Sequence, residues 1–314
     1  MFLLMYMFLI IMLLISIAYL TLLERKILSY MQLRKGPNKV GFMALMQPFS
    51  DGIKLFFSEQ VSLIYFNYFI YMISPMLMFM ISLFIWCIYP YIFCMISFSY
   101  GFMFFLCCSS MAVYGLLLCG WSSNSNYSLL GSLRAIAQVI SYEVGLVMIM
   151  ICIMIFTFGF NFFNLMDYQF YMWFVFFSFP LFFCWLSSCL AEVNRAPFDF
   201  AEGESELVSG FNIEYGGGGF ALIFLAEYGN IMLLSFLTVM IFLGCDLYSL
   251  LFYFKCIFIS FWFIWVRATL PRFRYDKLMY MIWKMFLPLS LNYFIFFIGF
   301  IFFMVTGFYF INLG

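Results

Sequence analysis

The sequence predicts an all-α integral membrane protein, a bundle of eight transmembrane helices plus a short interfacial amphipathic helix. Its composition is the first reason, because 67% of the 314 residues are hydrophobic and only 9% are charged. Soluble domains carry about 25% charged residues, so this chain lies outside their range. The second reason is a series of apolar runs of spanning length, and the third is an uneven distribution of basic residues between the connections.

The apolar runs define the spans. A helix rises 1.5 Å per residue, so roughly 20 apolar residues cross the hydrocarbon layer. The uncharged stretch from Gln60 to Leu133 is too long for one span, and Pro90 and the polar run 121–128 divide it. The first run lacks a basic leading segment and a cleavage site, which indicates a span instead of a removable signal. The eight predicted spans lie near 2–23, 65–88, 99–120, 135–158, 170–191, 219–243, 249–267 and 287–310.

The basic residues predict the orientation. Of the 14 Lys and Arg, 13 lie in or at the edges of alternate connections, and only Lys255 lies elsewhere. Basic loops stay on the inner side of a membrane, so these connections are expected to face the matrix or cytoplasm, with both termini on the other side. The sequence shows no internal repeat, so residues 1–314 are predicted to form a single polytopic membrane domain. Its matrix-side functional loops are 24–64, 121–134, 192–218 and 268–286.

Residues 41–60 are too short and too charged to span the membrane. Leu45, Phe49, Ile53 and Phe56 recur at spacings of three and four residues, which favours an amphipathic helix lying in the interface. Periodicity alone leaves an ordinary connecting helix on the matrix face as an alternative.

Two carboxylates, Glu143 and Glu227, fall inside predicted spans, and Glu192 lies at the mouth of the fifth. A charged side chain at mid-bilayer costs about 2.5–3.5 kcal/mol on insertion scales, so such acids are functional candidates. A neutral acid that hydrogen-bonds a neighbouring helix is the structural alternative. Arg134 lies nine residues before Glu143, on the opposite side of a straight helix, so the two are not expected to pair.

The connection after the fifth span is rich in acids, and Arg195 is its only cation. Apolar residues such as Phe198 and Phe200 interleave with these acids, which a purely solvated run would not need. Carboxylates that crowd together titrate as a coupled group, which suits a proton relay. Divalent cation binding stays open, because Glu202 and Glu206 are one helical turn apart. The acids of this connection are Glu192, Asp199, Glu202, Glu204, Glu206 and Glu214.

Iron–sulfur, zinc, haem and nucleic-acid sites are not expected. The chain has ten cysteines but no CxxC pair and no histidine, so metal ligation by this chain alone is not predicted. Its net charge is zero and its basic residues lie beside the membrane, which argues against nucleic acid. Gly216–Gly219 lacks a preceding strand and a following Lys, so it predicts a hinge at the start of the sixth span and not a phosphate cradle.

Several polar runs together resemble a known family. LLERKILSYMQLRKGPNKVG (22–41), QPFSDGIKLF (47–56), AEVNRAPFDFAEGESELVSGFNIEY (191–215), AEYGNI (226–231) and RATLPRFRYDKLM (267–279) are similar to subunit 1 of respiratory complex I, in its mitochondrially encoded form. The resemblance extends through nearly the whole chain. Two departures stand out: SEQVSL follows Phe56-Phe57, and four glycines occupy 216–219.

This resemblance implies an eight-helix subunit of the H⁺-translocating NADH:ubiquinone reductase, at the junction of the membrane and peripheral arms. Ubiquinone is then the substrate, and its tunnel runs through this chain. No redox centre is implied here: no cofactor is bound covalently or by metal ligation, and flavin and iron–sulfur clusters are expected only on partner subunits. The other membrane-arm and peripheral-arm subunits and membrane lipids are the implied partners, in the mitochondrial inner membrane.

The resemblance also implies roles for individual residues. Proton-path and coupling roles fall to Glu143, Glu192, Glu227, Asp199, Glu202, Glu204 and Glu206. Quinone-tunnel and arm-interface roles fall to Arg25, Arg34, Asp51, Arg195, Phe224, Tyr228 and Arg274. Two other functions stay open from the residues alone, a stand-alone proton or cation transporter and a structural anchor for a peripheral complex.

Overall fold

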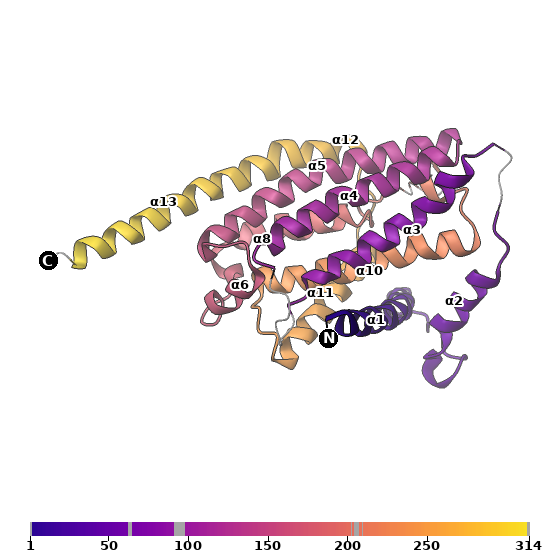
Figure 1. The fold of residues 1–314 in the computed structure, drawn as a ribbon, viewed down its shortest axis with the longest axis horizontal. Coiled ribbons are helices and arrows are strands. Elements are labelled where there is room, and N and C mark those ends of the chain that lie inside the picture. Colours follow the sequence, from indigo (N-terminus) through magenta and orange to yellow (C-terminus); the bar gives the residue numbers. More distant parts are fainter. Residues whose placement is uncertain are drawn as a thin grey trace.

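A computed structural model describes residues 2–61, 65–90, 98–201, 203, 207, 208 and 210–312. Three of the predicted coupling acids, Glu202, Glu204 and Glu206, lie outside these residues. The described part is all-helical, with no strand among its residues, and its long helices pack into one bundle (Figure 1). The predicted fold class is confirmed.

Seven helical segments of the described part are long and apolar enough to cross a membrane. They are built from α1 (Phe2–Met31), α3 (Tyr68–Ile85) with η2 (Trp86–Ile88), α4 (Gly101–Ser122), α5 (Asn126–Thr157), α10 (Gly217–Phe242), α11 (Leu250–Thr269), and α12 (Tyr275–Met281) continued by the π-helical turn η4 (Ile282–Phe286) into α13 (Leu287–Asn312). Short helices complete the described chain: η1 (Phe42–Ala44), α2 (Gln47–Phe57), α6 (Phe162–Tyr168), α7 (Phe174–Phe177) and η3 (Gly210–Asn212).

The fifth predicted span is the one that differs. It forms the shorter apolar helix α8 (Phe179–Glu192), preceded by the separate turn α7. Ser178 between them has a non-helical backbone, and Pro180 lies in the first turn of α8. Proline lacks an N–H and is tolerated in a first turn but not in a helix interior, so the run 170–191 breaks here.

Helix ends also differ from the hydropathy boundaries. α1 continues to Met31 instead of ending near Leu23, so Glu24 and Arg25 are helical, and α5 begins at Asn126, nine residues before the predicted start. Hydropathy marks the part of a helix that meets lipid, whereas charged and polar residues extend the helix past it.

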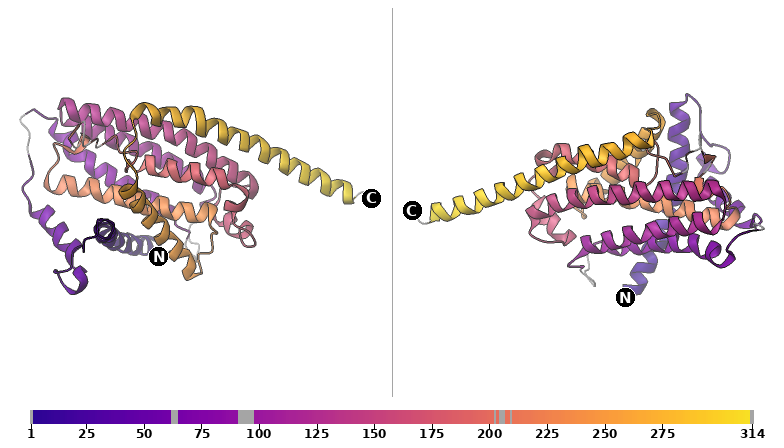
Figure 2. Two further views of the ribbon diagram at one scale, coloured as in Figure 1. Left: turned by 180° about the vertical axis from the view of Figure 1, so that it is seen from behind. Right: turned by 90° about the horizontal axis from the view of Figure 1, so that it is seen from above.

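α10 lies at the centre of the bundle, between α3 and α11 and beside α1 and α8 (Figures 1 and 2). Every residue from Leu233 to Phe242 is buried, as expected of a helix that is apolar all round. α1 runs obliquely against α10 and α11, and the C-terminal half of α13 projects beyond the bundle (Figure 2). Glu227, the one acid of α10, is therefore held among packed helices.

The predicted interfacial helix forms as α2. Its apolar side chains Phe49, Ile53 and Phe56 are exposed in the isolated chain, as expected of a helix that presents them to lipid. Asp51 pairs with Arg25 of α1, and Gln47 Nε2 donates to Asp51 Oδ1 at 2.9 Å. The Arg25–Asp51 pair holds α2 against the C-terminal end of α1, and the Gln47 bond orients the Asp51 carboxylate.

Candidate functional site

The segment that follows α8 is anchored at both ends. Gln138 of α5 is fully buried, and its Nε2 donates to the carbonyls of Ala191 and Phe198, each at 2.8 Å. The Phe273 N–H donates to the Pro197 carbonyl at 3.0 Å. These bonds fix residues 191–198 against α5 on one side and the α11–α12 connection on the other, so Arg195 has a defined position.

Arg195 belongs to a buried cluster around Glu24 of α1, called here the Glu24 centre. Arg195 Nη1 lies 3.0 Å from Glu24 Oε1, and Arg267 of α11 bonds to the same oxygen. Tyr228 of α10 donates its hydroxyl to Glu24 Oε2 at 2.6 Å. The Arg195 guanidinium also lies over the Tyr228 ring, 4.7 Å from its centroid. Four elements of the fold therefore meet at one carboxylate.

The charges in this centre stabilise one another. Glu24 is only 5% exposed, so an isolated carboxylate there would be costly, and the two arginines and one hydroxyl compensate it. Burial alone lowers the pKa of Arg195, but the nearby Glu24, Tyr228 and Glu227 outweigh it and raise that pKa well above its ordinary value. Arg195 is therefore a permanent cation, shared between Glu24 and Glu227.

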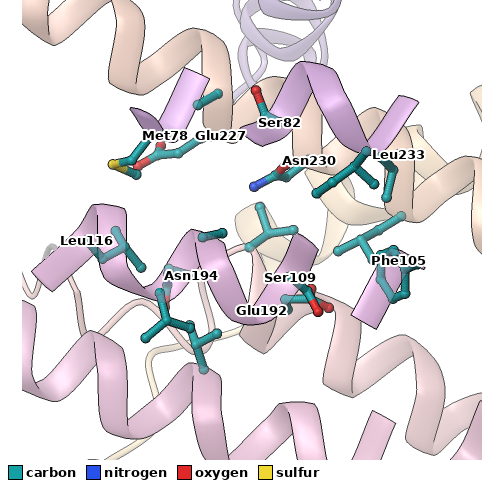
Figure 3. A pocket seen from close by; sticks show the side chains of 17 residues that line it. Met78, Ser82, Phe105, Ser109, Leu116, Glu192, Asn194, Glu227, Asn230 and Leu233 are labelled. Carbon is teal, nitrogen blue, oxygen red and sulfur yellow. The ribbon is translucent and has the colours of Figure 1, made fainter. Parts of the chain in front are cut away.

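Glu227 faces a second region, the acidic cavity, formed by α3, α4, α8 and α10 (Figure 3). Its volume is about 60 Å³. Glu192 lines the same cavity, together with the polar side chains Ser82, Ser109, Asn194 and Asn230. That volume exceeds the 10–15 Å³ that one water needs, and the lining offers several polar partners, so the space suits water.

Glu143 of α5 extends this region. Its carboxyl lies near Ser109 of the cavity wall, and it interacts electrostatically with Glu192. Within the described residues, Glu143 Oε1 and Glu192 Oε2 are buried without a hydrogen-bond partner. The structure thus brings together four of the predicted residues. Arg195 and Glu227 lie on one side of the cavity, Glu192 lines it, and Glu143 lies beyond Glu192.

Other predicted residues lie apart from these two regions. Asp199 is buried and pairs with Arg272 at 3.2 Å. Arg274 is 80% exposed and pairs with Asp276, while Arg34 is exposed in the connection after α1. Phe224 lies on α10 between Phe220 and Tyr228, with ring centroids 4.3 and 6.5 Å away.

Two residues of the Glu24 centre were not among the predicted site residues, Glu24 and Arg267. Both stand at predicted span ends, where a charged residue usually marks the water boundary. Their partners lie 171 to 243 positions away in the chain, so no local pattern reveals them. One signal was available: both fall inside the quoted family motifs, in LLERKIL and RATLPRF.

Comparison with known proteins identifies the group to which this fold and site belong. The sequence model of the family described as NADH dehydrogenase matches residues 4–298. The chain belongs to the NADH dehydrogenase family.

The NADH dehydrogenase family includes close relatives of this chain. It is 60% identical over 291 residues to the NADH-ubiquinone oxidoreductase chain 1 of Anopheles gambiae, covering 93% of each protein. It is 60% identical over 299 residues to that of Locusta migratoria, covering 95% of each, and 48% identical over 293 residues to that of Osphranter rufus, covering 91% and 92%. The predicted resemblance, and with it an enzyme subunit of the NADH:ubiquinone reductase, is confirmed.

The Cys, Asp and Glu side chains of this NADH dehydrogenase family member are dispersed in the part of the chain that the structure describes. No group of three or more Cys, Asp or Glu side chains in the described residues lies close enough to hold a metal ion. The cysteines of the same part are free thiols, most of them buried or half-buried in apolar surroundings.

Proposed function

We propose that this chain guides ubiquinone through the membrane arm of an NADH:ubiquinone oxidoreductase and couples quinone reduction to proton translocation. One observation carries the proposal: Arg195 interacts with both Glu24 and Glu227, so a single buried cation joins the Glu24 centre to the acidic cavity. The relatives are named for NADH and ubiquinone, which supplies the substrate.

In this proposal the quinone route runs beside α1, α2 and α10, three helices that contact one another. Phe220, Phe224 and Tyr228 follow one face of α10 at four-residue spacing, which suits an isoprenoid tail. The polar groups next to this face belong to the Glu24 centre and to the Arg25–Asp51 pair. In this proposal they meet the headgroup or brace the tunnel wall.

The coupling step follows from charge. When an electron reaches the quinone ahead of a proton, negative charge develops on the headgroup near the route. That charge competes for Arg195, which then compensates Glu227 less well, and the loss of a neighbouring cation favours proton uptake by a carboxylate. Through the cavity, Glu227 exchanges protons with Glu192, and Glu192 with Glu143. The chain supplies this path while flavin and iron–sulfur clusters stay on partner subunits.

The acidic connection has a related role in the proposal. Asp199 is held by Arg272 at the start of this connection, which ties it to the α11–α12 segment. Glu202, Glu204 and Glu206 lie outside the described residues, so their place in the proton path rests on the family resemblance alone.

Partners and orientation complete the proposal. Arg34 and Arg274 are exposed in connections expected on the matrix side, where the peripheral arm would dock. Both termini then lie on the intermembrane-space side of the mitochondrial inner membrane, with lipids around the exposed apolar helices. No role in binding nucleic acid is proposed.

The test is a Glu227→Gln variant in the assembled enzyme, reconstituted in vesicles. We expect lower proton pumping per NADH oxidised, because Gln keeps the shape of the side chain but cannot carry a proton. Asp246→Asn serves as the control, since Asp246 is exposed in the α10–α11 connection. Unchanged pumping in Glu227→Gln would refute the proton path.

The two other functions are separated by simple measurements. A stand-alone transporter would move protons as the purified chain alone in liposomes. A structural anchor would tolerate neutral residues at Glu143, Glu192 and Glu227 together without loss of rate or pumping.

A further inference from the structure

A second cavity lies where the end of α2 meets the first turns of α3 and α10. Its volume is about 220 Å³, and it shares no lining residue with the acidic cavity. Phe56, Gln60 and Val61 line it from α2 and the segment that follows. The remaining lining residues belong to the start of α3 and to the start of α10, and they are Phe66, Tyr68, Tyr71, Met72, Pro75, Met76, Tyr215, Gly216, Gly218, Gly219 and Leu222.

The walls of this cavity are apolar. Tyr71 and Tyr215 stack at 4.3 Å with their planes 6° apart, but their hydroxyls are engaged elsewhere. Tyr71 donates to the Glu214 carbonyl at 2.7 Å, and the Tyr215 hydroxyl lies 3.0 Å from Ser74 Oγ. Among the described residues that line the cavity, none is charged and Gln60 is the only amide side chain. A hydrocarbon fits these walls better than a polar headgroup, which would leave its donors and acceptors unpaired.

The glycine run shapes the cavity floor. A Cβ at Gly216 would lie 2.8 Å from Val61 Cγ2, and Gly217 has a positive φ of 56° with the Ser58 and Glu59 carbonyls 3.1 Å from its Cβ position. These two glycines therefore allow residues 58–61 to approach α10 closely. At Gly218, which also lines the cavity, a Cβ would meet Phe56 and Gln60 at 3.9 Å, an ordinary contact, so a side chain fits there. The hinge stays a prediction, while this packing is visible in the fold.

The position of the cavity indicates its occupant. Its walls are the first two turns of α3 and α10, directly beside the interfacial helix α2. Acyl chains of phospholipids begin at that depth, with their headgroups outside the apolar layer. A quinone headgroup in this place would find no charged side chain among the described lining residues, and the Tyr71 and Tyr215 hydroxyls are already engaged.

From this geometry we propose that the cavity binds one acyl chain of a membrane phospholipid. The chain fills the space beside Gly218 and fastens the end of α2 to α3 and α10. The headgroup stays at the membrane surface, so the site selects a chain and not a particular headgroup. This proposal does not depend on the proposed coupling function.

The experiment uses the whole enzyme in vesicles that contain phosphatidylcholine with a diazirine in one acyl chain. After illumination, labels are expected on peptides that cover 56–76 and 215–222, and these labels should resist brief washing with unlabelled lipid. Labels on the exposed face of α13 should wash out. Equal loss from both regions would overturn the proposal.

A substitution sharpens the test. Gly218→Leu should fill the cavity without backbone strain, because no positive φ is required there. Each methylene displaced weakens binding about fourfold, so loss of two predicts about fifteenfold less retained label. Gly299→Leu on exposed α13 is the control, because its Cβ would meet nothing within 4 Å and it lies far from the cavity lining. Unchanged label in Gly218→Leu would overturn the proposal.

Two further measurements keep the result unambiguous. NADH oxidation with an artificial acceptor reports whether each variant assembles. If Gly218→Leu does not assemble, the labelling of the unsubstituted enzyme still tests the proposal. A ubiquinone carrying the photoreactive group on its tail is the competing probe. Strong labelling of 215–222 by that quinone, with displacement of the lipid label, would identify an isoprenoid chain as occupant and overturn the lipid proposal.

Discussion

The Glu24 centre and the acidic cavity place carboxylates in the same bundle but treat them in opposite ways. Glu24 has two arginines and a tyrosine hydroxyl as partners, and it is a fully compensated charge. Glu143 and Glu192 each keep a buried oxygen without a partner in the described residues, and their neighbours are other acids. Cationic partners keep a buried carboxylate ionised, whereas a buried carboxylate without such partners can bind and release a proton.

Arg195 belongs to both regions, so its removal should have the largest effect. In Arg195→Leu, Glu24 loses one of its two cations inside the bundle and Glu227 loses its compensation. Leaving a buried charge without its partner costs about 3–5 kcal/mol. We expect little assembled enzyme and no coupled activity, measured as enzyme content on native gels and as NADH:ubiquinone rate. Lys284→Leu is the control, because Lys284 is exposed. Normal assembly of Arg195→Leu would contradict the central place given to this cation.

Glu24 and Glu192 can be compared directly with the same substitution. Glu24→Gln leaves two arginines facing a neutral amide. It should lower the free energy of unfolding of the enzyme by about 1.5–3 kcal/mol, the range for hydrogen bonds to charged groups. Glu192→Gln removes no ion pair and should leave thermal stability nearly unchanged while pumping falls. Thermal inactivation and proton pumping are measured on both variants. Equal destabilisation by the two substitutions would contradict the distinction between compensated and uncompensated acids.

Tyr228→Phe separates hydrogen bonding from packing inside the Glu24 centre. The variant loses the 2.6 Å bond to Glu24 but keeps the ring beneath Arg195. We expect kcat/KM for ubiquinone to fall by the equivalent of about 1–2 kcal/mol of transition-state stabilisation, while the enzyme still assembles. Phe224→Leu, which removes a ring but no hydrogen bond, is the comparison. A larger effect of Phe224→Leu would show that the aromatic face, and not the hydroxyl, matters for the quinone.

The sequence predicts this architecture unevenly, and the reasons are physical. Hydropathy locates the spans because lipid contact requires apolar side chains, and the amphipathic pattern of α2 is equally local. The break before α8 depends on Pro180 within an otherwise apolar run, which a hydropathy window averages away. Hydropathy singles out Glu143 and Glu227 as acids inside spans, and the quoted family motifs contain Glu192 and Glu227. Their connection through Arg195, and the pairing of Glu24 with Arg267, arises only when helices distant in sequence pack together.

The glycine run shows a similar limit. Four consecutive glycines predict freedom of the backbone, which is a property of the isolated segment. In the fold, Gly217–Gly219 begin α10, and Gly216 and Gly217 lie against residues 58–61. Their small size matters there as much as their flexibility, and neighbours 155 to 159 positions earlier in the chain cannot be read from a local pattern.

The Arg25–Asp51 pair offers the weakest test of the comparison, because it is compensated like Glu24 but lies near water. Its side chains are 41% and 36% exposed, against 6% for Glu24. Exposed pairs contribute about 0–1 kcal/mol and are screened by salt. Asp51→Asn should therefore change the apparent KM for ubiquinone by less than about fivefold, with a smaller difference from wild type at high salt. Rates measured across a salt series test this. A large salt-independent loss would mean that Asp51 contacts the quinone route directly, and that burial is not what divides the two kinds of carboxylate.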